Sequence, residues 1–497
     1  MLEKKDIIGY TTPEMAGVPS ENIEKFIAIL EDIGMALHDV VIARGNDIIF
    51  ECYWAPYHKD YLHRMYSITK SYVAIAIGFL EQDGLISLDD PMEKFFPEEL
   101  KAQPDQNQHR QTIRHMLMMS TAKPPRTWRG LRPDDWVKHY FSNPLEETKP
   151  SGTGWKYDSI GSHVLGAIVE RVTGKRFIDY LREKLLSKIG VSEEAYCLKA
   201  PGGHSWMDAG LLCRPTDLLR TIRFILNGGK WNGEQILNEE YVKAATSKQI
   251  DNTLPGAIPC KCQGYGYQIW KGVQDSFYFL GMHTQIALGV PGKDFILIFN
   301  GDCFDKYNAQ TQTIFDSFFD LIVNAASDTP IPENEAAQQS LKEHTKDLKL
   351  ITAKGEKHSP KEKLINNVTY KMDENPMDFS KLCFSFDGDK CRLIYTNATG
   401  DKELTFGMCR NEFGLFPEEG YAKEVASVYA PGNYYRCAAS GAWIKEDTLH
   451  IIIQIIDTYL GSLHITVKFG DGDVDISIFK DGEDYMNEYE GDAHGRA

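Results

Sequence analysis

The sequence predicts a mixed α/β (α+β) domain over residues 1–327 and an all-β domain over residues 364–497. In the first part, strand-like apolar runs lie near both ends and enclose a long stretch with helical periodicity. In the last part, short alternating apolar runs are broken by Gly, Asp and Asn, which is typical of a barrel or sandwich. Residues 328–363 are polar and rich in Lys, Glu and Gln, which favours a partly helical linker.

The first part is predicted to begin with a β-hairpin and to continue into a buried helix. Gly45 and Asn46 separate two apolar runs and can supply the dihedral angles of a hairpin turn. A helix is expected from Ser67 to Gln82, because its apolar positions are nearly continuous, and Gly84 follows it as a C-terminal stop signal. The other expected elements are helices at 162–172, 177–186, 215–227 and 316–325 and strands at 265–270, 277–280, 286–290 and 295–299.

The composition argues against several classes of function. The formal net charge is -17, and such an acidic surface repels nucleic acid and anionic membranes. No apolar signal segment or membrane-spanning stretch is found, so we expect a cytoplasmic protein with reduced thiols. Cys260 and Cys262 are the only close pair of cysteines, and their spacing matches no common zinc motif, so neither a metal nor a cofactor is expected.

Ser67 and Lys70 are the first candidates for chemistry. A serine hydroxyl becomes a good nucleophile only when a base takes its proton, and a lysine of lowered pKa can do so. Spacing of i and i+3 on a helix places the two side chains together. A serine at the start of a helix also has free backbone N–H groups beside it, which can hold an oxyanion.

The Ser-x-x-Lys pattern occurs three times, but only one match suits this chemistry. Ser120 to Lys123 runs into two prolines, so no helix can carry it. Ser477 to Lys480 lies in alternating sequence typical of a strand, where i and i+3 point to opposite faces. Only Ser67 opens a predicted helix. Without partners downstream, Ser67 would be read as an ordinary helix-capping serine.

Tyr157 and Ser159 are the candidate partners, because they form a Tyr-x-Ser pattern just before a predicted helix. A tyrosine on that loop could serve as a base or proton relay, and the Ser159 hydroxyl could accept a hydrogen bond from Lys70. The alternative reading of Tyr157 is a half-buried core tyrosine. Tyr395 to Asn397 is a stricter Tyr-x-Asn match, but it lies in the predicted β-domain.

Six motifs in order resemble the serine β-lactamase and penicillin-binding protein family, nearest its class C and esterase-like branch. The resemblance covers about residues 10 to 325 and is far more specific than any single motif. The motifs are Tyr66-Ser-Ile-Thr-Lys-Ser71, Gly84-Leu-Ile-Ser-Leu-Asp-Asp-Pro91, Thr112-Ile-Arg-His-Met-Leu117, Tyr157-Asp-Ser159, Gly210-Leu-Leu-Cys-Arg-Pro-Thr-Asp-Leu218 and Gly281-Met-His-Thr-Gln-Ile286.

The resemblance implies acyl transfer through a covalent ester on Ser67, with Lys70 and Tyr157 passing protons. It also implies an oxyanion hole made by the backbone N–H groups of Ser67 and Gln285. The implied fold is an antiparallel sheet flanked by helices, with a helical subdomain and the site at their junction. The predicted β-domain resembles the barrels appended to some esterases and aminopeptidases of this family, either as a stabilising unit or as a source of a loop over the site.

Two departures from the family pattern bear on the substrate. The usual Tyr-x-Asn is here Tyr-x-Ser, with Ser159 in the place of the asparagine. The usual Lys-Thr-Gly is here Met282-His-Thr284, so the lysine that attracts a substrate carboxylate is missing, although His283 could replace part of it. We therefore expect a hydrolase of small esters, amides or short peptides that is similar to the family's carboxylesterases or its D-amino-acid amidases and peptidases. The alternatives are a weak β-lactamase or D-Ala peptidase, and a degenerate member that binds a ligand without turnover.

Overall fold

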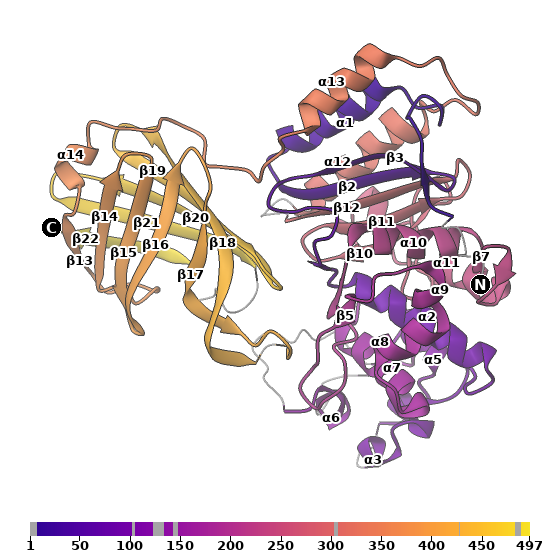
Figure 1. The fold of residues 1–497 in the computed structure, drawn as a ribbon. Coiled ribbons are helices and arrows are strands. Elements are labelled where there is room, and N and C mark those ends of the chain that lie inside the picture. Colours follow the sequence, from indigo (N-terminus) through magenta and orange to yellow (C-terminus); the bar gives the residue numbers. More distant parts are fainter. Residues whose placement is uncertain are drawn as a thin grey trace. The chain divides into compact units, whose positions relative to one another are not determined.

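The computed structural model describes residues 7–101, 105–122, 134–142, 148–302, 307–426, 428–482 and 489–497, and they form two compact units (Figure 1). The first unit runs to Lys349 and includes Glu424–Ala426. The second unit holds the other residues that follow Lys349. The mixed first domain and the all-β second domain predicted from the sequence are both confirmed.

The centre of the first unit is a seven-stranded sheet of order β1-β3-β2-β12-β11-β10-β9. Its strands pair antiparallel, except that β1 and β3 are parallel. The strands at its centre are buried along nearly their whole length, because helices cover both faces. The strands are β1 (Gly9–Tyr10), β2 (Ala36–Arg44), β3 (Asp47–Tyr53), β9 (Trp270–Lys271), β10 (Phe277–Gly281), β11 (Gln285–Val290) and β12 (Phe295–Asp302).

One face of the sheet is covered by α1 (Ser20–Asp32) and α12 (Tyr307–Phe318), whose apolar side chains form one core with the strands. A further helix, α13 (Glu335–Thr345), packs against α1 (Figure 1). The sequence predicts a partly helical linker here. In the structure this segment belongs to the first unit, because its few apolar residues, such as Leu341, are buried on that core.

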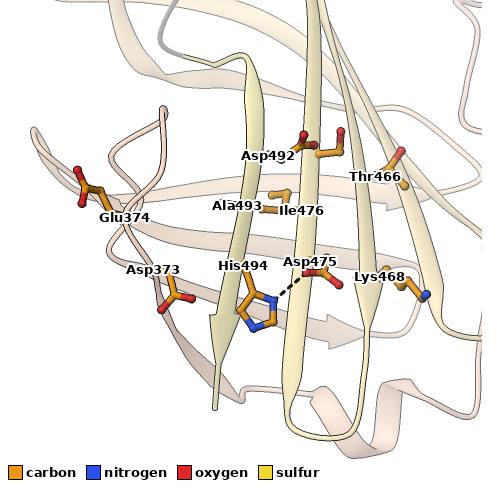
Figure 2. Close-up of a pocket in the computed structure, with 10 residues that line it drawn as sticks. Asp373, Glu374, Thr466, Lys468, Asp475, Ile476, Asp492, Ala493 and His494 are labelled. Carbon is orange, nitrogen blue, oxygen red and sulfur yellow. Dashed lines mark hydrogen bonds and ion pairs between the residues drawn. The ribbon is translucent and has the colours of Figure 1, made fainter.

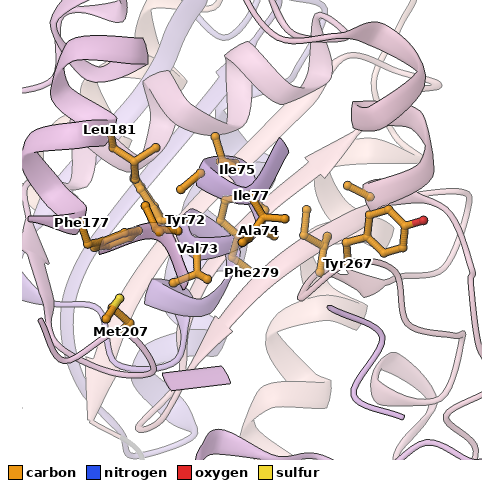
Figure 3. Packing of buried hydrophobic residues seen from close by; sticks show 14 of the residues in the cluster. Tyr72, Val73, Ala74, Ile75, Ile77, Phe177, Leu181, Met207, Tyr267 and Phe279 are labelled. Atoms are coloured by element: carbon orange, nitrogen blue, oxygen red, sulfur yellow. The ribbon is translucent and has the colours of Figure 1, made fainter. Parts of the chain in front are cut away.

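The other face is covered by α10 (Pro215–Leu226) and by α2 (Ile68–Gln82), the helix that the sequence predicts after Ser67. Every residue of α2 from Ile68 to Leu80 is buried. Figure 3 shows this packing, in which Tyr72 and Val73 lie near Phe177 and near Phe279 of β10. The helix is therefore a rigid support for the residue at its start.

A helical subdomain surrounds the far side of α2, around α5 (Ile113–Leu117), α7 (Ser159–Thr173) and α8 (Phe177–Leu181). The remaining elements of this unit are β4 (His63–Arg64), η1 (Met92–Lys94), α3 (Pro97–Leu100), α4 (Gln106–His109), α6 (Trp136–Ser142), η2 (Arg182–Leu186), α9 (Ser187–Ile189), β5 (Tyr196–Cys197), β6 (Leu211–Cys213), β7 (Lys230–Trp231), β8 (Glu234–Gln235), α11 (Glu239–Thr246), η3 (Pro259–Lys261) and η4 (Phe319–Val323).

The second unit is a β-barrel with one extra strand. Nine strands close into a cylinder through the parallel pairing of β16 with β18, while β17 pairs with β18 outside this closure. Alternate side chains of the strands fill its interior. The elements are α14 (Glu362–Ile365), β13 (Thr369–Met372), β14 (Lys381–Asp387), β15 (Lys390–Asn397), β16 (Gly400–Met408), β17 (Glu412–Tyr421), β18 (Tyr429–Lys445), β19 (Thr448–Ile456), β20 (Leu460–Phe469), β21 (Asp473–Gly482) and β22 (Gly491–Arg496).

Candidate active site

Ser67 lies at the N-terminus of α2, directly after a tight turn in the backbone. Tyr66 has φ of 45°, in the left-handed region that is costly for an aromatic residue. Two hydrogen bonds hold the turn: Met65 N donates to Leu211 O at 2.9 Å, and Thr69 Oγ1 donates to Tyr66 O at 2.6 Å. The local bonds and the buried helix thus fix the position of the Ser67 hydroxyl.

Lys70 is in hydrogen-bond contact with Ser67. Its Nζ lies 2.8 Å from Ser67 Oγ and donates to the backbone carbonyl of Asp208 at 2.7 Å. The side chain is buried, with 1% of its surface exposed. The i, i+3 spacing predicted from the sequence therefore brings a buried amine to the serine hydroxyl, as nucleophile activation requires.

Tyr157 lies next to Ser67 and Lys70, whereas Ser159 is not hydrogen-bonded to Lys70 among the described residues. Lys70 Nζ is 5.2 Å from the centroid of the Tyr157 ring, which stacks on Trp270. The loop is anchored by Asp158, which caps α7 by accepting a hydrogen bond from Gly161 N at 2.8 Å. Among the described residues, the Ser159 hydroxyl makes no hydrogen bond to Lys70. The structure thus gathers Ser67, Lys70 and Tyr157, and leaves Ser159 at the first position of α7.

The third motif forms the turn between β10 and β11. His283 and Thr284 both have left-handed φ values, 62° and 71°. The side chain of Gln285 braces the turn, since its Nε2 donates to Met282 O at 2.9 Å and to Gly301 O at 2.8 Å. At the position of the family's glycine, Thr284 thus adopts a left-handed backbone conformation that favours glycine.

Gly281 lets this turn lie directly against the backbone just before Ser67. A Cβ atom at this position would be 2.4 Å from the carbonyl oxygen of Met65, so only glycine fits without a shift of the backbone. On the same side, the ring of His283 lies 5.4 Å from the ring of Tyr66. The third motif therefore borders the turn that carries Ser67.

His283 is paired with a carboxylate that the sequence did not reveal. Its Nδ1 lies 2.6 Å from Oδ1 of Asp302, and both side chains are buried. Asp302 ends β12, and no motif marks it in the sequence. Because Asp302 already faces the imidazole, a substrate carboxylate would have to compete with it for any positive charge on His283.

Several other buried polar residues near the turn also escaped prediction. The guanidinium of Arg64 lies 4.3 Å from the ring centroids of both Tyr66 and Trp206. His63 and His38 are hydrogen-bonded to one another at 2.8 Å. The only usable signal in the sequence was position, because His63 and Arg64 lie three to four residues before Ser67.

The rejected sequence matches form no serine–lysine contact among the described residues, and Ser120 instead donates to the carbonyl oxygen of Gly154 at 2.9 Å, in the loop before Tyr157. Ser477 is part of β21, as expected, while Lys123 falls outside the described residues. Tyr395 and Asn397 both donate hydrogen bonds to the buried carboxylate of Glu418 in the barrel. Those side chains serve the packing of the second unit.

A groove on the barrel surface contains acidic and basic side chains, including Asp475 ion-paired with His494 and nearby Lys468 (Figure 2). Ser477 and Lys468 both line it, but no hydrogen bond joins their side chains among the described residues. Within the part of the chain that the structure describes, no cluster of three His, Cys, Asp or Glu side chains could hold a metal ion. No helix of that part is long and apolar enough to cross a bilayer.

A sequence model of the family described as Beta-lactamase matches residues 23–302, more than half of the chain. The chain belongs to the beta-lactamase family. The match includes all the motifs from Ser67 to Gln285, so the fold implied by the resemblance is confirmed.

Named hydrolases are among the relatives of this beta-lactamase family member. The 6-aminohexanoate-dimer hydrolase of Paenarthrobacter ureafaciens is 25% identical over 47% of this chain and 64% of its own length. Esterase EstB of Burkholderia gladioli is 31% identical over 24% of this chain and 34% of its own. The chain thus aligns with less than two thirds of either relative. A solved structure of a candidate 6-aminohexanoate-dimer hydrolase from Bacillus anthracis has a TM-score of 0.53 at 19% identity, covering 66% of this chain and 89% of that one.

Proposed function

We propose that this protein hydrolyses ester or amide bonds of small molecules or short peptides through an acyl-enzyme on Ser67. The observation that carries the proposal is the 2.8 Å contact between Lys70 Nζ and Ser67 Oγ at the start of a buried helix. A helix-capping serine has no need of a buried lysine, whereas a nucleophilic serine needs a base at this distance. The names of the relatives, a hydrolase and an esterase, support the same reaction class.

In the proposed reaction the Lys70 amine takes the Ser67 proton as Oγ bonds to the substrate carbonyl carbon. The carbonyl electron pair moves onto oxygen, and the backbone N–H groups of Ser67 and Gln285 stabilise that oxyanion. When the intermediate collapses, the bond to the alcohol or amine breaks, and Lys70 or Tyr157 protonates the leaving group. Water then attacks the acyl-enzyme in the same way, which releases the acid and restores Ser67.

The third motif favours neutral substrates. Met282 stands where the family has a lysine and carries no charge. His283 faces the buried carboxylate of Asp302, which opposes the approach of a second carboxylate. A charge-assisted hydrogen bond is worth about 1.5–3 kcal/mol, so its loss lowers affinity for a carboxylate-bearing β-lactam by about 10- to 150-fold.

A fluorophosphonate probe tests the nucleophile without knowledge of the substrate. In this reaction Ser67 Oγ bonds to phosphorus, fluoride leaves, and the serine proton passes to the base. We expect labelling and p-nitrophenyl ester hydrolysis in the native protein and neither in Ser67→Ala, whereas Ser477→Ala, in the barrel, retains both. A native protein that does not label would contradict the proposal and favour the non-catalytic alternative.

Screening p-nitrophenyl esters, D-amino-acid amides and nitrocefin would then define the substrate class. We expect the best neutral ester to exceed nitrocefin by at least about tenfold in kcat/KM. Nitrocefin turnover equal to that of the best ester would favour the β-lactamase alternative.

A further inference from the structure

Two buried histidines outside the family motifs connect the nucleophile turn to the central sheet. His63 lies in β4, four residues before Ser67, and His38 lies in β2. Their side chains are 1% and 2% exposed, and His38 Nδ1 lies 2.8 Å from His63 Nε2. A buried hydrogen bond between two imidazoles needs one ring to donate and the other to accept.

The direction of this hydrogen bond follows from the backbone. His63 Nδ1 lies 2.9 Å from the carbonyl oxygen of Arg64, which can only accept, so Nδ1 carries the proton. In the neutral ring Nε2 is then an acceptor, and His38 Nδ1 must donate to it. Burial lowers the pKa of His63 to about 4 and that of His38 well below its ordinary value, so both rings remain neutral near pH 7.

The rings have little freedom to move. His38 stacks on Tyr57, with 3.9 Å between the ring centroids, and Tyr57 is itself buried. His38 also belongs to β2, which pairs with β3 and β12 in the middle of the sheet. The donor therefore has a fixed position from which it can restrain β4.

The segment from His63 to Ser67 needs such a restraint. β4 is two residues long: His63 pairs with Cys213 and Arg64 with Leu212 of β6, and the next residue, Met65, donates its N–H to Leu211 O. It leads directly into Tyr66, whose left-handed conformation persists only if the surroundings hold it. The hydrogen bond from His38 to His63 is a second attachment, which restrains this segment from the side of the central sheet.

We propose that His38 and His63 are positioning residues, whose mutual hydrogen bond holds the turn that presents Ser67 for attack. This inference rests on the proposed role of Ser67. Neither histidine is placed in contact with substrate, so both act through the backbone from Arg64 to Ser67. Loss of the bond should slow chemistry at Ser67 more than it weakens substrate binding, because a small misplacement of a nucleophile costs rate steeply.

The test is the rate of Ser67 labelling by a fluorophosphonate, measured well below the melting temperature. His63→Phe keeps the ring volume and removes the hydrogen bond, whereas His63→Gln retains an acceptor. We expect labelling to slow at least about tenfold in His63→Phe, with recovery in His63→Gln, and ester hydrolysis to lose kcat with little change in KM. His464→Phe, which removes a histidine contact in the barrel, should label at the native rate.

A double-mutant cycle separates positioning from general damage. His38→Phe should slow labelling as much as His63→Phe, and the double variant should be no slower than either. His38→Phe also tests the bond if His63→Phe does not fold. Native labelling rates in the folded phenylalanine variants, or strictly additive effects, would overturn this inference. Absence of labelling in the native protein would instead overturn the proposed function.

Discussion

Asp39 is a buried carboxyl group that should destabilise the protein near neutral pH. It lies on β2 with 2% of its surface exposed, and its side chain accepts a hydrogen bond from Asn300 at 2.8 Å. Burial raises its pKa to about 8 despite this hydrogen bond. An unfolded aspartate has a pKa of about 3.9, so the folded state keeps a proton over this interval while the unfolded state loses it.

The sign of the effect follows from this difference. As pH rises from about 4 to about 8, the unfolded state is increasingly favoured by about 1.36 kcal/mol per unit. The free energy of unfolding should fall by up to about 5 kcal/mol across the interval and then level off. Asp39→Asn retains the acceptor for Asn300 and cannot ionise, so it mimics the protonated side chain and removes this loss.

We therefore expect Asp39→Asn to be nearly neutral at pH 4 and to stabilise the first unit by several kcal/mol at pH 8. Urea unfolding followed by circular dichroism at both pH values measures the difference, and the melting temperature offers a second readout. Asp89→Asn is the matched control: Asp89 is exposed and pairs with Arg114, which lowers the pKa of its carboxyl group, so this variant should give no gain. A gain for Asp39→Asn at pH 8 no larger than that at pH 4 would refute the reasoning.

Three further predictions concern the site and its surroundings. Met282→Lys, at a half-exposed position, should raise kcat/KM for carboxylate-bearing β-lactams about 10- to 150-fold relative to a neutral ester, and no change in that ratio would contradict the role given to the third motif. Gly281→Ala should lower stability by about 1–3 kcal/mol and slow Ser67 labelling, because its Cβ meets Met65 O, whereas Gly292→Ala meets nothing within 4 Å and should behave like the native protein. Burial lowers the pKa of His163 to about 3, so stability should decrease as pH falls from about 6.5 to about 3, and His163→Gln should move the midpoint of acid unfolding to lower pH.

The sequence predicted those parts of the structure that depend on local pattern. Continuous apolar positions identified α2 and its start at Ser67, and Gly84 adopts the left-handed conformation expected of a helix stop. The Gly45 turn was likewise expected, although β2 begins earlier than predicted, at Ala36. Alternating short runs were sufficient to identify the second unit as all-β.

Long-range polar pairs could not be predicted from one sequence. Asp302 meets His283 because β12 ends beside the turn between β10 and β11, and His38 meets His63 because the fold brings β4 close to β2. The two members of each pair are far apart in sequence, and a single buried histidine carries no local sequence pattern that would identify its partner. The burial of α13, within the segment predicted to be a partly helical linker, likewise depends on contacts with the distant helix α1.

The tenth strand of the barrel has a consequence for how the protein behaves at high concentration. β17 lies outside the closed cylinder and exposes Phe413 and Leu415. An exposed apolar edge strand of this kind favours aggregation by edge-to-edge strand pairing. Its pairing with β18 shifts register twice, between Leu415 and Glu419 and again before Tyr421. Such irregularities interrupt the flat ladder of amides that an incoming strand would need as a template. The edge strand of the barrel thus exposes apolar side chains, while its irregular pairing hinders the addition of further strands.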